Sequence, residues 1–213
     1  MSFSTVLFDL DGTLLNTLTD LSTSVNYTLQ SLAYPTHDEK TICSFIGDGM
    51  TKLIQRALGE NSQSLEEALA IFYTHYSLHY ADYTTPYANI YAMLTSLSDT
   101  ITLGVVSNKN DEYTKSLVQK FFGNIFSFSI GKKDDMPPKP NAKSTNYAMN
   151  ILNAVPEKTL YVGDSYVDFQ TAKNAGISFA GVTWGFHSKE EWSKYAIYPV
   201  FHEPESLQKW ILS

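Results

Sequence analysis

Thr5-Val6-Leu7-Phe8-Asp9-Leu10-Asp11-Gly12-Thr13 is an apolar run that ends in two carboxylates, a glycine and a hydroxyl. Residues i and i+2 of a strand point the same way, so Asp9 and Asp11 can leave the end of one strand towards one site. Two carboxylates that close repel each other unless a cation lies between them or one stays protonated. The pattern therefore indicates a hard metal ion, a carboxylate nucleophile and a carboxyl group that transfers protons. The alternative is an ordinary strand followed by an Asp-Gly turn.

The composition is that of a folded, acidic protein. Of the 213 residues, 43% are hydrophobic, and the formal net charge is −7, which does not favour nucleic acid. A phosphate ester would therefore need positive charge from the site itself. The single cysteine, Cys43, excludes an internal disulfide. Since we find no signal peptide and no run of 18 apolar residues, we expect a cytoplasmic protein that does not contact a membrane.

Apolar runs recur along the chain as buried strands would. They cover residues 6–8, 101–106, 126–130, 160–162 and 179–182, and helix-length segments lie at 112–122, 142–152 and 167–175. This alternation predicts the α/β class, with a parallel sheet and helices on both faces.

The segment from residue 17 to residue 85 has a different pattern. It contains no strong strand run, and apolar residues recur at helical spacing: Leu18, Leu21, Val25 and Leu29, then Leu65, Leu69, Phe72, Tyr76 and Tyr80. We therefore expect a core of residues 1–16 and 86–213 and a helical insertion over residues 17–85.

A second acidic pattern follows a later strand, in Tyr161-Val162-Gly163-Asp164. Asp164 can reach a metal at the carboxyl edge of the sheet, and Asp168, four residues on, can orient it or bind the metal through water. The alternative for the Asp residues is a helix N-cap.

Two further groups could contact a phosphate. Ser107-Asn108-Lys109 follows the strand that ends at Val106, so a hydroxyl and backbone N–H groups could bind an anion there, although an N-cap is an equal alternative. Lys139 follows two prolines and could neutralise a phosphate, with Lys132, Lys133 and Lys143 as rivals.

Two further patterns have a structural interpretation. His75 and His79 have the i, i+4 spacing of a metal pair, but a third ligand is not apparent. Trp184-Gly185-Phe186 is interpreted as a segment that closes a strand and packs.

Taken together, these residues resemble the haloacid dehalogenase superfamily, and within it the phosphoglycolate phosphatases. The resemblance spans the chain, and its motifs are Asp9 to Thr13, Phe45-Ile46-Gly47-Asp48-Gly49, Ser107-Asn108, Lys139-Pro140, Gly163-Asp164 through Asp168, and Gly181 to Gly185. Ala142 departs from it, since relatives often have a second proline there. It implies a Rossmann-like core, with residues 17–85 as a small mobile cap.

The resemblance also implies a mechanism. Asp9 would attack phosphorus, and Asp11 would protonate the leaving alcohol and then activate water. Mg²⁺ would be held by Asp9, Asp164 and the backbone carbonyl of Asp11, with support from Asp168. Ser107, Asn108 and Lys139 would bind the phosphoryl group.

The expected substrate is a small phosphorylated metabolite, and the resemblance implies 2-phosphoglycolate. Gly47, Asp48, Lys52 and Arg56 are the predicted specificity residues, because a cation on that helix could hold the carboxylate of a small acid. A pyrophosphatase, a phosphosugar mutase and a non-catalytic binding protein stay open, whereas a dehalogenase would leave Asp11 without a role. We expect a monomer or a homodimer.

Overall fold

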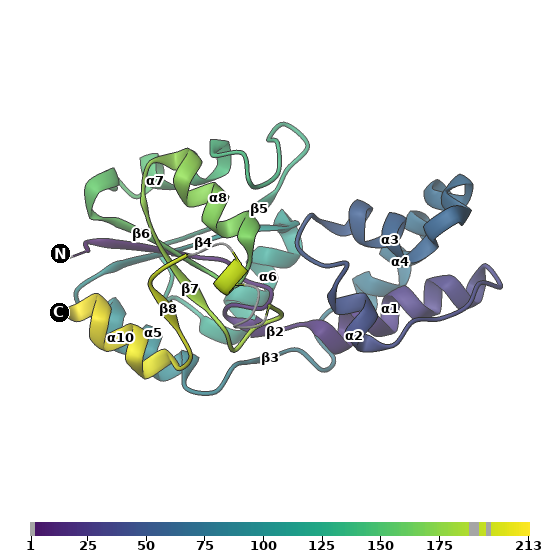
Figure 1. Cartoon of the computed structure of the whole chain (residues 1–213), viewed down its shortest axis with the longest axis horizontal. Helices are drawn as coiled ribbons and strands as arrows, with labels where there is room; N and C mark the ends of the chain where they lie inside the picture. The colour runs from purple at the N-terminus through teal and green to yellow at the C-terminus, as the bar shows by residue number, and fades with distance from the viewer. Residues whose placement is uncertain (1–2, 188–191, 195–196) are drawn as a thin grey trace. The chain divides into compact units, whose positions relative to one another are not determined.

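The structure of the protein is a computed structural model, which describes residues 3–187, 192–194 and 197–213. The chain divides into two compact units, one of residues 1–15 and 86–213 and the other of residues 16–85. The first contains a sheet flanked by helices, and the second is built mainly from helices (Figure 1). The chain crosses between them at β2 (Leu15–Asn16) and β3 (Thr85–Pro86), which pair as a two-stranded sheet.

The first unit is organised around one parallel sheet. Its strand order is β5-β4-β1-β6-β7-β8, and every neighbouring pair is parallel. The strands are β1 (Thr5–Phe8), β4 (Thr102–Asn110), β5 (Phe128–Lys132), β6 (Thr159–Gly163), β7 (Ser178–Val182) and β8 (Val200–Phe201). The predicted α/β class with a parallel sheet is confirmed. β8 was not predicted, because two residues are too short to give an apolar run.

Helices lie on both faces of this sheet. α7 (Lys143–Ile151) and α8 (Tyr166–Ala175) lie on one side, and α5 (Ile90–Ser98) and α10 (Pro204–Leu212) lie on the other (Figure 1). α6 (Asp111–Phe122) connects β4 to β5. A short 3₁₀ turn, η2 (Pro156–Lys158), leads into β6.

β1 lies at the centre of the sheet and sets the position of the site. Val6, Leu7 and Phe8 are completely buried. β4 and β6 pair with its two edges and helices cover both faces, so the strand is apolar on both sides rather than alternating. Its carboxyl end therefore delivers Asp9 to the middle of one sheet edge.

β4 is longer than predicted. The strand continues past Val106 to Asn110, with a shift of register against β5 between these two residues. The N-cap of α6 is consequently Asn110, whose side chain accepts a hydrogen bond from the backbone N–H of Glu112. Ser107 and Asn108 thus lie inside a strand, and the N-cap alternative for them is wrong.

The second unit consists of α1 (Leu18–Ser31), α2 (Glu39–Cys43), α3 (Met50–Leu58), a 3₁₀ segment η1 (Gly59–Ser64) and α4 (Leu65–His79). α1 and α4 pack against each other along the predicted apolar stripes. The members of these stripes that are fully enclosed are Leu21, Val25, Leu29, Phe72 and Tyr76.

A buried carboxylate joins the beginning and the end of this unit. Asp20 in the first turn of α1 accepts hydrogen bonds from the backbone N–H groups of Tyr83 (2.9 Å) and Thr84 (2.8 Å). The hydroxyl of Thr84 donates to the same carboxylate at 2.6 Å. Three donors satisfy a charge that is 1% exposed, so the segment before β3 is fixed to the start of α1.

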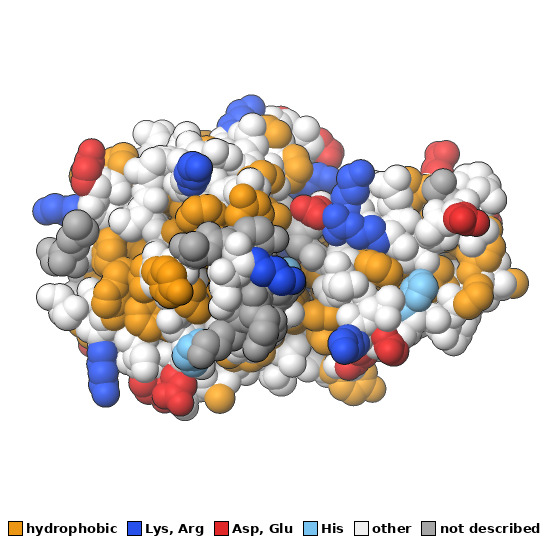
Figure 2. Space-filling model, in the orientation of Figure 1, with side chains coloured by type: hydrophobic (Ala, Val, Ile, Leu, Met, Phe, Trp, Pro, Cys, Tyr) orange, Lys and Arg blue, Asp and Glu red, His pale blue; other side chains and the backbone are white. Residues whose placement is uncertain are grey.

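The surface carries charges of both signs. On the face drawn in Figure 2, Lys and Arg side chains are scattered among acidic and uncharged ones rather than forming one broad basic surface. Within the described part of the chain, none of the helices has the length and apolar character needed to cross a bilayer.

Candidate active site

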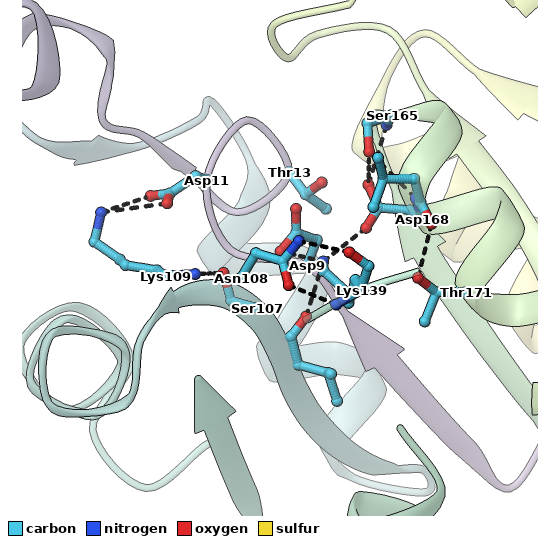
Figure 3. Close-up of polar contacts among 12 residues, drawn as sticks. Asp9, Asp11, Thr13, Ser107, Asn108, Lys109, Lys139, Ser165, Asp168 and Thr171 are labelled. Atoms are coloured by element: carbon cyan, nitrogen blue, oxygen red, sulfur yellow. Dashed lines mark hydrogen bonds and ion pairs between the residues drawn. The ribbon is translucent and has the colours of Figure 1, made fainter. Parts of the chain in front are cut away.

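Asp9 occupies the carboxyl end of the central strand. Its backbone N–H donates to the carbonyl of Val162 at 2.9 Å, which continues the pairing of β1 with β6. The side chain is 12% exposed, and its Oδ1 lies 2.8 Å from the ammonium of Lys139 (Figure 3). Burial raises the pKa of Asp9 to about 7; the charge of Lys139 opposes this increase, and the charges of Asp168 and Asp164 add to it.

Lys139 is held rigidly beside Asp9. Its ammonium donates to Asp168 Oδ1 (2.7 Å), to the hydroxyl of Tyr161 (3.0 Å) and to the carbonyl of Val106 (3.2 Å). Burial acts to lower the pKa of Lys139, but the charges of Asp168 and Asp9 raise it well above its usual range. The ammonium is therefore permanent and fixed in place.

The rival lysines point elsewhere. Lys132 is exposed, and the ammonium of Lys133 lies 3.8 Å from Asp111. Lys143 donates to the backbone carbonyl of Asp135 at 3.0 Å. Of the lysines considered from the sequence, the structure brings Lys139 to Asp9.

Asn108 positions Lys139. Its Oδ1 accepts from the backbone N–H of Lys139 at 2.7 Å, and its Nδ2 donates to the carbonyl of the same residue at 3.1 Å. Both ends of the amide are thus used on the Lys139 backbone. These bonds fix the loop that carries the lysine, and the phosphate contact expected of Asn108 stays a prediction.

Ser107 lies beside this group and is 5% exposed. Its Oγ accepts a hydrogen bond from the backbone N–H of Lys109 at 3.2 Å. A hydroxyl group both accepts and donates, so Ser107 retains a proton that can be directed to an anion.

Asp164 follows β6 and is enclosed by the loop after β1. Its Oδ1 accepts from the hydroxyl of Thr13 (3.2 Å), and its Oδ2 from the backbone N–H of Phe186 (2.8 Å). Gly12 has φ +82°, and a Cβ at that position would lie 2.3 Å from Asp164 Oδ2. Glycine is therefore required at residue 12 by both backbone conformation and close approach.

The segment after β7 supports the same loop. Trp184 Nε1 donates to the carbonyl of Thr13 at 2.9 Å, and a Cβ on Gly185 would lie 1.8 Å from the carbonyl of Gly12. Trp184-Gly185-Phe186 was predicted to close a strand and pack. The structure shows that it also contacts the loop after β1 and Asp164. The run Gly-Val-Thr-Trp-Gly was the available signal, but the sequence does not reveal which loop it contacts.

Asp168 bonds Ser165 as well as the Lys139 ammonium. Its Oδ2 accepts from the backbone N–H (3.1 Å) and the hydroxyl (2.6 Å) of Ser165, and Ser165 Oγ accepts in return from the Asp168 N–H. This capping box begins α8, which ends at Gly176 in the left-handed conformation. Such a cap stabilises a helix by about 1 kcal/mol. The N-cap of α8 is Ser165, and Asp168 is the N3 partner.

Asp9, Asp164 and Asp168 form one acidic group. Ligand atoms of all three lie within 4.8 Å of one another. The three carboxylates face a single ammonium, that of Lys139, so the buried site has an excess of negative charge. A cation would remove this excess, and oxygen donors are those that hard divalent metals prefer. The residues therefore fit a divalent metal ion. Asp9 and Asp164 are better placed than Asp168, because both oxygens of Asp168 already have partners, Oδ1 in the Lys139 ammonium and Oδ2 in Ser165.

Asp11 does not join this group. β1 ends at Phe8, and the carbonyl of Leu10 accepts hydrogen bonds from Thr13 and Leu14 in a turn. The expectation that Asp9 and Asp11 project together from one strand is therefore wrong. The carboxylate of Asp11 instead pairs with Lys109, at 3.1 Å (Oδ1) and 3.2 Å (Oδ2) from its ammonium (Figure 3).

Sequence reasoning assigned no role to Lys109. Its side chain is fully enclosed, whereas the Asp11 side chain is 13% exposed. A lysine directly after Ser107-Asn108 was visible in the sequence, but its pairing with Asp11 depends on the turn after β1.

The predicted specificity residues lie in the second unit and are described within it. Gly47 (φ +124°) and Gly49 (φ +89°) both adopt left-handed backbone, as expected for a tight turn before α3. Arg56 pairs with Asp48 and donates to the carbonyl of Phe45 at 2.8 Å, which fixes this turn. The ammonium of Lys52 donates to the neutral amide of Gln55 at 3.1 Å.

His75 and His79 also lie in the second unit, on α4. Burial lowers the pKa of His75, and His79 lowers it further. They are distant in sequence from every acidic residue of the group around Asp9.

An open parallel sheet with carboxylates and an ammonium gathered at its carboxyl edge defines an α/β enzyme that acts at that edge. The family model described as haloacid dehalogenase-like hydrolase matches residues 6–182. The chain therefore belongs to the haloacid dehalogenase-like hydrolase family.

Comparison with individual proteins indicates which kind of hydrolase the chain is similar to. The chain is 34% identical over 200 residues to a phosphoglycolate phosphatase of Colwellia psychrerythraea, covering 89% of this chain and 88% of that protein. It is 32% identical over 183 residues to a phosphoglycolate phosphatase of Aquifex aeolicus, covering 85% of each. A solved structure from Lactobacillus delbrueckii subsp. bulgaricus, described as a candidate phosphoglycolate phosphatase, gives a TM-score of 0.95 at 27% identity and covers 100% of this chain and 99% of that one. The resemblance seen in the motifs is confirmed, and the chain is an enzyme of the phosphatase class.

Proposed function

We propose that this protein is a Mg²⁺-dependent phosphomonoesterase that acts through an aspartyl-phosphate on Asp9, and that its substrate is 2-phosphoglycolate. The observation that carries the proposal is the buried Asp9 carboxylate at the end of β1, 2.8 Å from a fixed ammonium and within a group of three acidic residues. A nucleophile for phosphorus needs this combination of low solvent access and adjacent positive charge.

In the first half-reaction, an oxygen of Asp9 attacks phosphorus and the bond to the leaving alkoxide breaks. Asp11, turned away from Lys109 and in its protonated form, gives its proton to that alkoxide, which leaves as the alcohol. In the second half-reaction, Asp11 takes a proton from water as the water oxygen attacks phosphorus. The bond to Asp9 then breaks, phosphate leaves, and both carboxyl groups return to their starting state.

The charge on the transferring phosphoryl group is met by residues that the fold holds in place. Lys139 offers its ammonium, and Ser107 offers the proton of its hydroxyl. Asp168 and Asn108 serve this arrangement indirectly, since one binds the Lys139 ammonium and the other binds its backbone. Neither needs to touch the substrate.

Asp9 and Asp164 would hold the metal ion, with the backbone carbonyl of Asp11 that the family resemblance implies. When bound there, Mg²⁺ supplies positive charge to the phosphoryl oxygens and favours the ionised form of Asp9. Oxygen donors and a preference for water in the remaining positions suit Mg²⁺.

The substrate proposal rests on the relatives named phosphoglycolate phosphatase and on one residue of the second unit. We propose that residues 17–85 act as a cap that reads the leaving group. Within the described residues Lys52 forms no ion pair, so its ammonium is available to a small carboxylate. A cytoplasmic location and a monomeric or homodimeric state remain predictions.

The test is phosphate release from 2-phosphoglycolate, an aryl phosphate, pyrophosphate and a hexose phosphate, with Mg²⁺ and after exhaustive chelation. We expect turnover that needs the metal, with the highest kcat/KM on 2-phosphoglycolate. Asp9→Asn should lose at least a thousandfold, whereas Asp99→Asn, an exposed matched control at the end of α5, should be unchanged. Near-normal turnover by a folded Asp9→Asn variant, or full activity without metal, would overturn the mechanism. A higher kcat/KM on pyrophosphate than on 2-phosphoglycolate would show that the proposed substrate is wrong.

A further inference from the structure

Two imidazoles in the second unit form a pair outside the phosphatase site. His75 and His79 lie one turn apart on α4, with ring centroids 4.4 Å apart and ring planes at 31°. Tyr27 of α1 stacks on His75 at a centroid distance of 4.1 Å. Both histidines line a hollow of about 580 Å³, together with Tyr27, Ser31, Thr74 and Leu78. The pair is therefore oriented by its surroundings and accessible from solvent.

The Nδ1 atom of each ring faces an oxygen. His79 Nδ1 lies 2.7 Å from Asp82 Oδ2. An ionised carboxylate can only accept, so the ring proton of neutral His79 lies on Nδ1 and its lone pair on Nε2. His75 Nδ1 lies 3.0 Å from the hydroxyl oxygen of Ser24, which accepts a hydrogen bond in the tautomer that carries the proton on Nδ1. Histidines that bind metals typically donate their other ring N–H to a carboxylate or another oxygen.

The spacing completes the geometric argument. Residues i and i+4 of a helix lie on the same face, so both rings border the same hollow. Imidazole nitrogens suit Zn²⁺, Ni²⁺ and Cu²⁺, whereas the all-oxygen group around Asp9 suits Mg²⁺. Contact between two aromatic rings would explain the stacking, but it does not call for an oxygen on the Nδ1 atom of both.

We propose that His75 and His79 form a second metal site, which takes a borderline transition-metal dication through the two Nε2 atoms. Asp82 and Ser24 orient the rings. The two protein ligands leave the other coordination positions to water. This site is independent of the proposed phosphatase reaction.

The test is calorimetric titration of the full metal-stripped chain with Ni²⁺, in excess Mg²⁺ so that the carboxylate site is filled. We expect one Ni²⁺ to bind each molecule of the parent protein. A His202→Gln control should also bind one Ni²⁺, with the same affinity. His202 is a matched control, since it lies in the first unit and its Nδ1 also faces a hydroxyl, 2.7 Å away on Thr183. His79→Gln should weaken that binding at least tenfold, and Asp82→Asn about 10- to 100-fold.

A folding defect is separated from a lost ligand by two measurements. The His79 side chain is 44% exposed, so His79→Gln should keep the circular dichroism and unfolding midpoint of the metal-free parent. In the parent, Zn²⁺ should shift the imidazole ¹⁵N resonances of both histidines at Nε2 and leave those at Nδ1 nearly unchanged. Equal Ni²⁺ binding by the parent and a folded His79→Gln variant would overturn the proposal, as would unshifted Nε2 resonances.

Discussion

At the scale of single residues, the site contains two lysines whose aspartate partners the fold keeps distinct. Lys139 belongs to Asp9 and Asp168, and Lys109 belongs to Asp11 (Figure 3). Because Lys109 bonds both oxygens of Asp11, it fixes the orientation from which the proposed acid and base must turn. We therefore expect this ion pair to influence the proposed reaction without touching the substrate.

We predict that Lys109→Met lowers kcat about tenfold on an alkyl phosphate and less on an aryl phosphate. An alkyl leaving group needs a proton from Asp11, whereas a phenolate with a low pKa can leave without one. Single-turnover rates on the two substrates measure this difference. Lys115→Met is the control, since Lys115 also pairs with an aspartate, Asp111, but is 53% exposed and remote from Asp11. Equal losses on both substrates would indicate a purely structural role.

A second residue-scale prediction concerns pH. In metal-free protein the pKa of Asp9 is about 7, above its usual value of 3.8, so the folded state holds this proton more tightly than the unfolded state. The contribution of Asp9 to stability is then full below pH 4 and declines as pH rises to about 7, by on the order of 2–4 kcal/mol.

Asp9→Asn should therefore be more stable than the parent at pH 8 without metal, and equally stable near pH 4. Urea unfolding at the two pH values measures the difference, and Mg²⁺ should reduce it at pH 8. A difference that is the same at both pH values would contradict the assigned pKa shift.

At the scale of elements, α3 and the turn before it give different partners to two cations that look equivalent in the sequence. Lys52 and Arg56 are four residues apart, yet Arg56 pairs with Asp48 and the carbonyl of Phe45. It is therefore needed for the turn, whereas Lys52 can bind a ligand.

We predict that Lys52→Ala raises KM for 2-phosphoglycolate about tenfold and leaves an uncharged aryl phosphate unaffected. Arg56→Ala should instead lower activity on both substrates and reduce the unfolding midpoint. Steady-state kinetics on the two substrates test this directly. If Lys52→Ala affects both substrates equally or neither, Lys52 does not bind the substrate carboxylate.

Elements also show why part of the structure could be predicted and part could not. β1 and α8 follow from local chemistry: a fully apolar strand, and a helix with a capping box and a final glycine. The role of Asn108 and the pairing of Lys109 depend on contacts with residues 31 and 98 positions away. No sequence pattern in one segment reveals these partners. The end of β4 was misplaced for the same reason, since its register against β5 shifts after Val106.

At the scale of the whole molecule, the chain leaves and re-enters the first unit at one place. β2 and β3 pair directly, and Asp20 binds the two residues that precede β3. The ends of the second unit are thus neighbours, although about 70 residues separate them along the chain. The connection of β1 to the rest of the sheet does not depend on the length of what lies between.

This arrangement has an evolutionary consequence. A segment whose two ends meet can be exchanged for another of different size while every strand of the sheet keeps its neighbours. Recombination at Leu15–Asn16 and Thr85–Pro86 would then give the same catalytic machinery a new set of substrates in one event. The paired strands β2 and β3 would stay the same in such enzymes, and their sequences would differ most in the segment inserted between these strands.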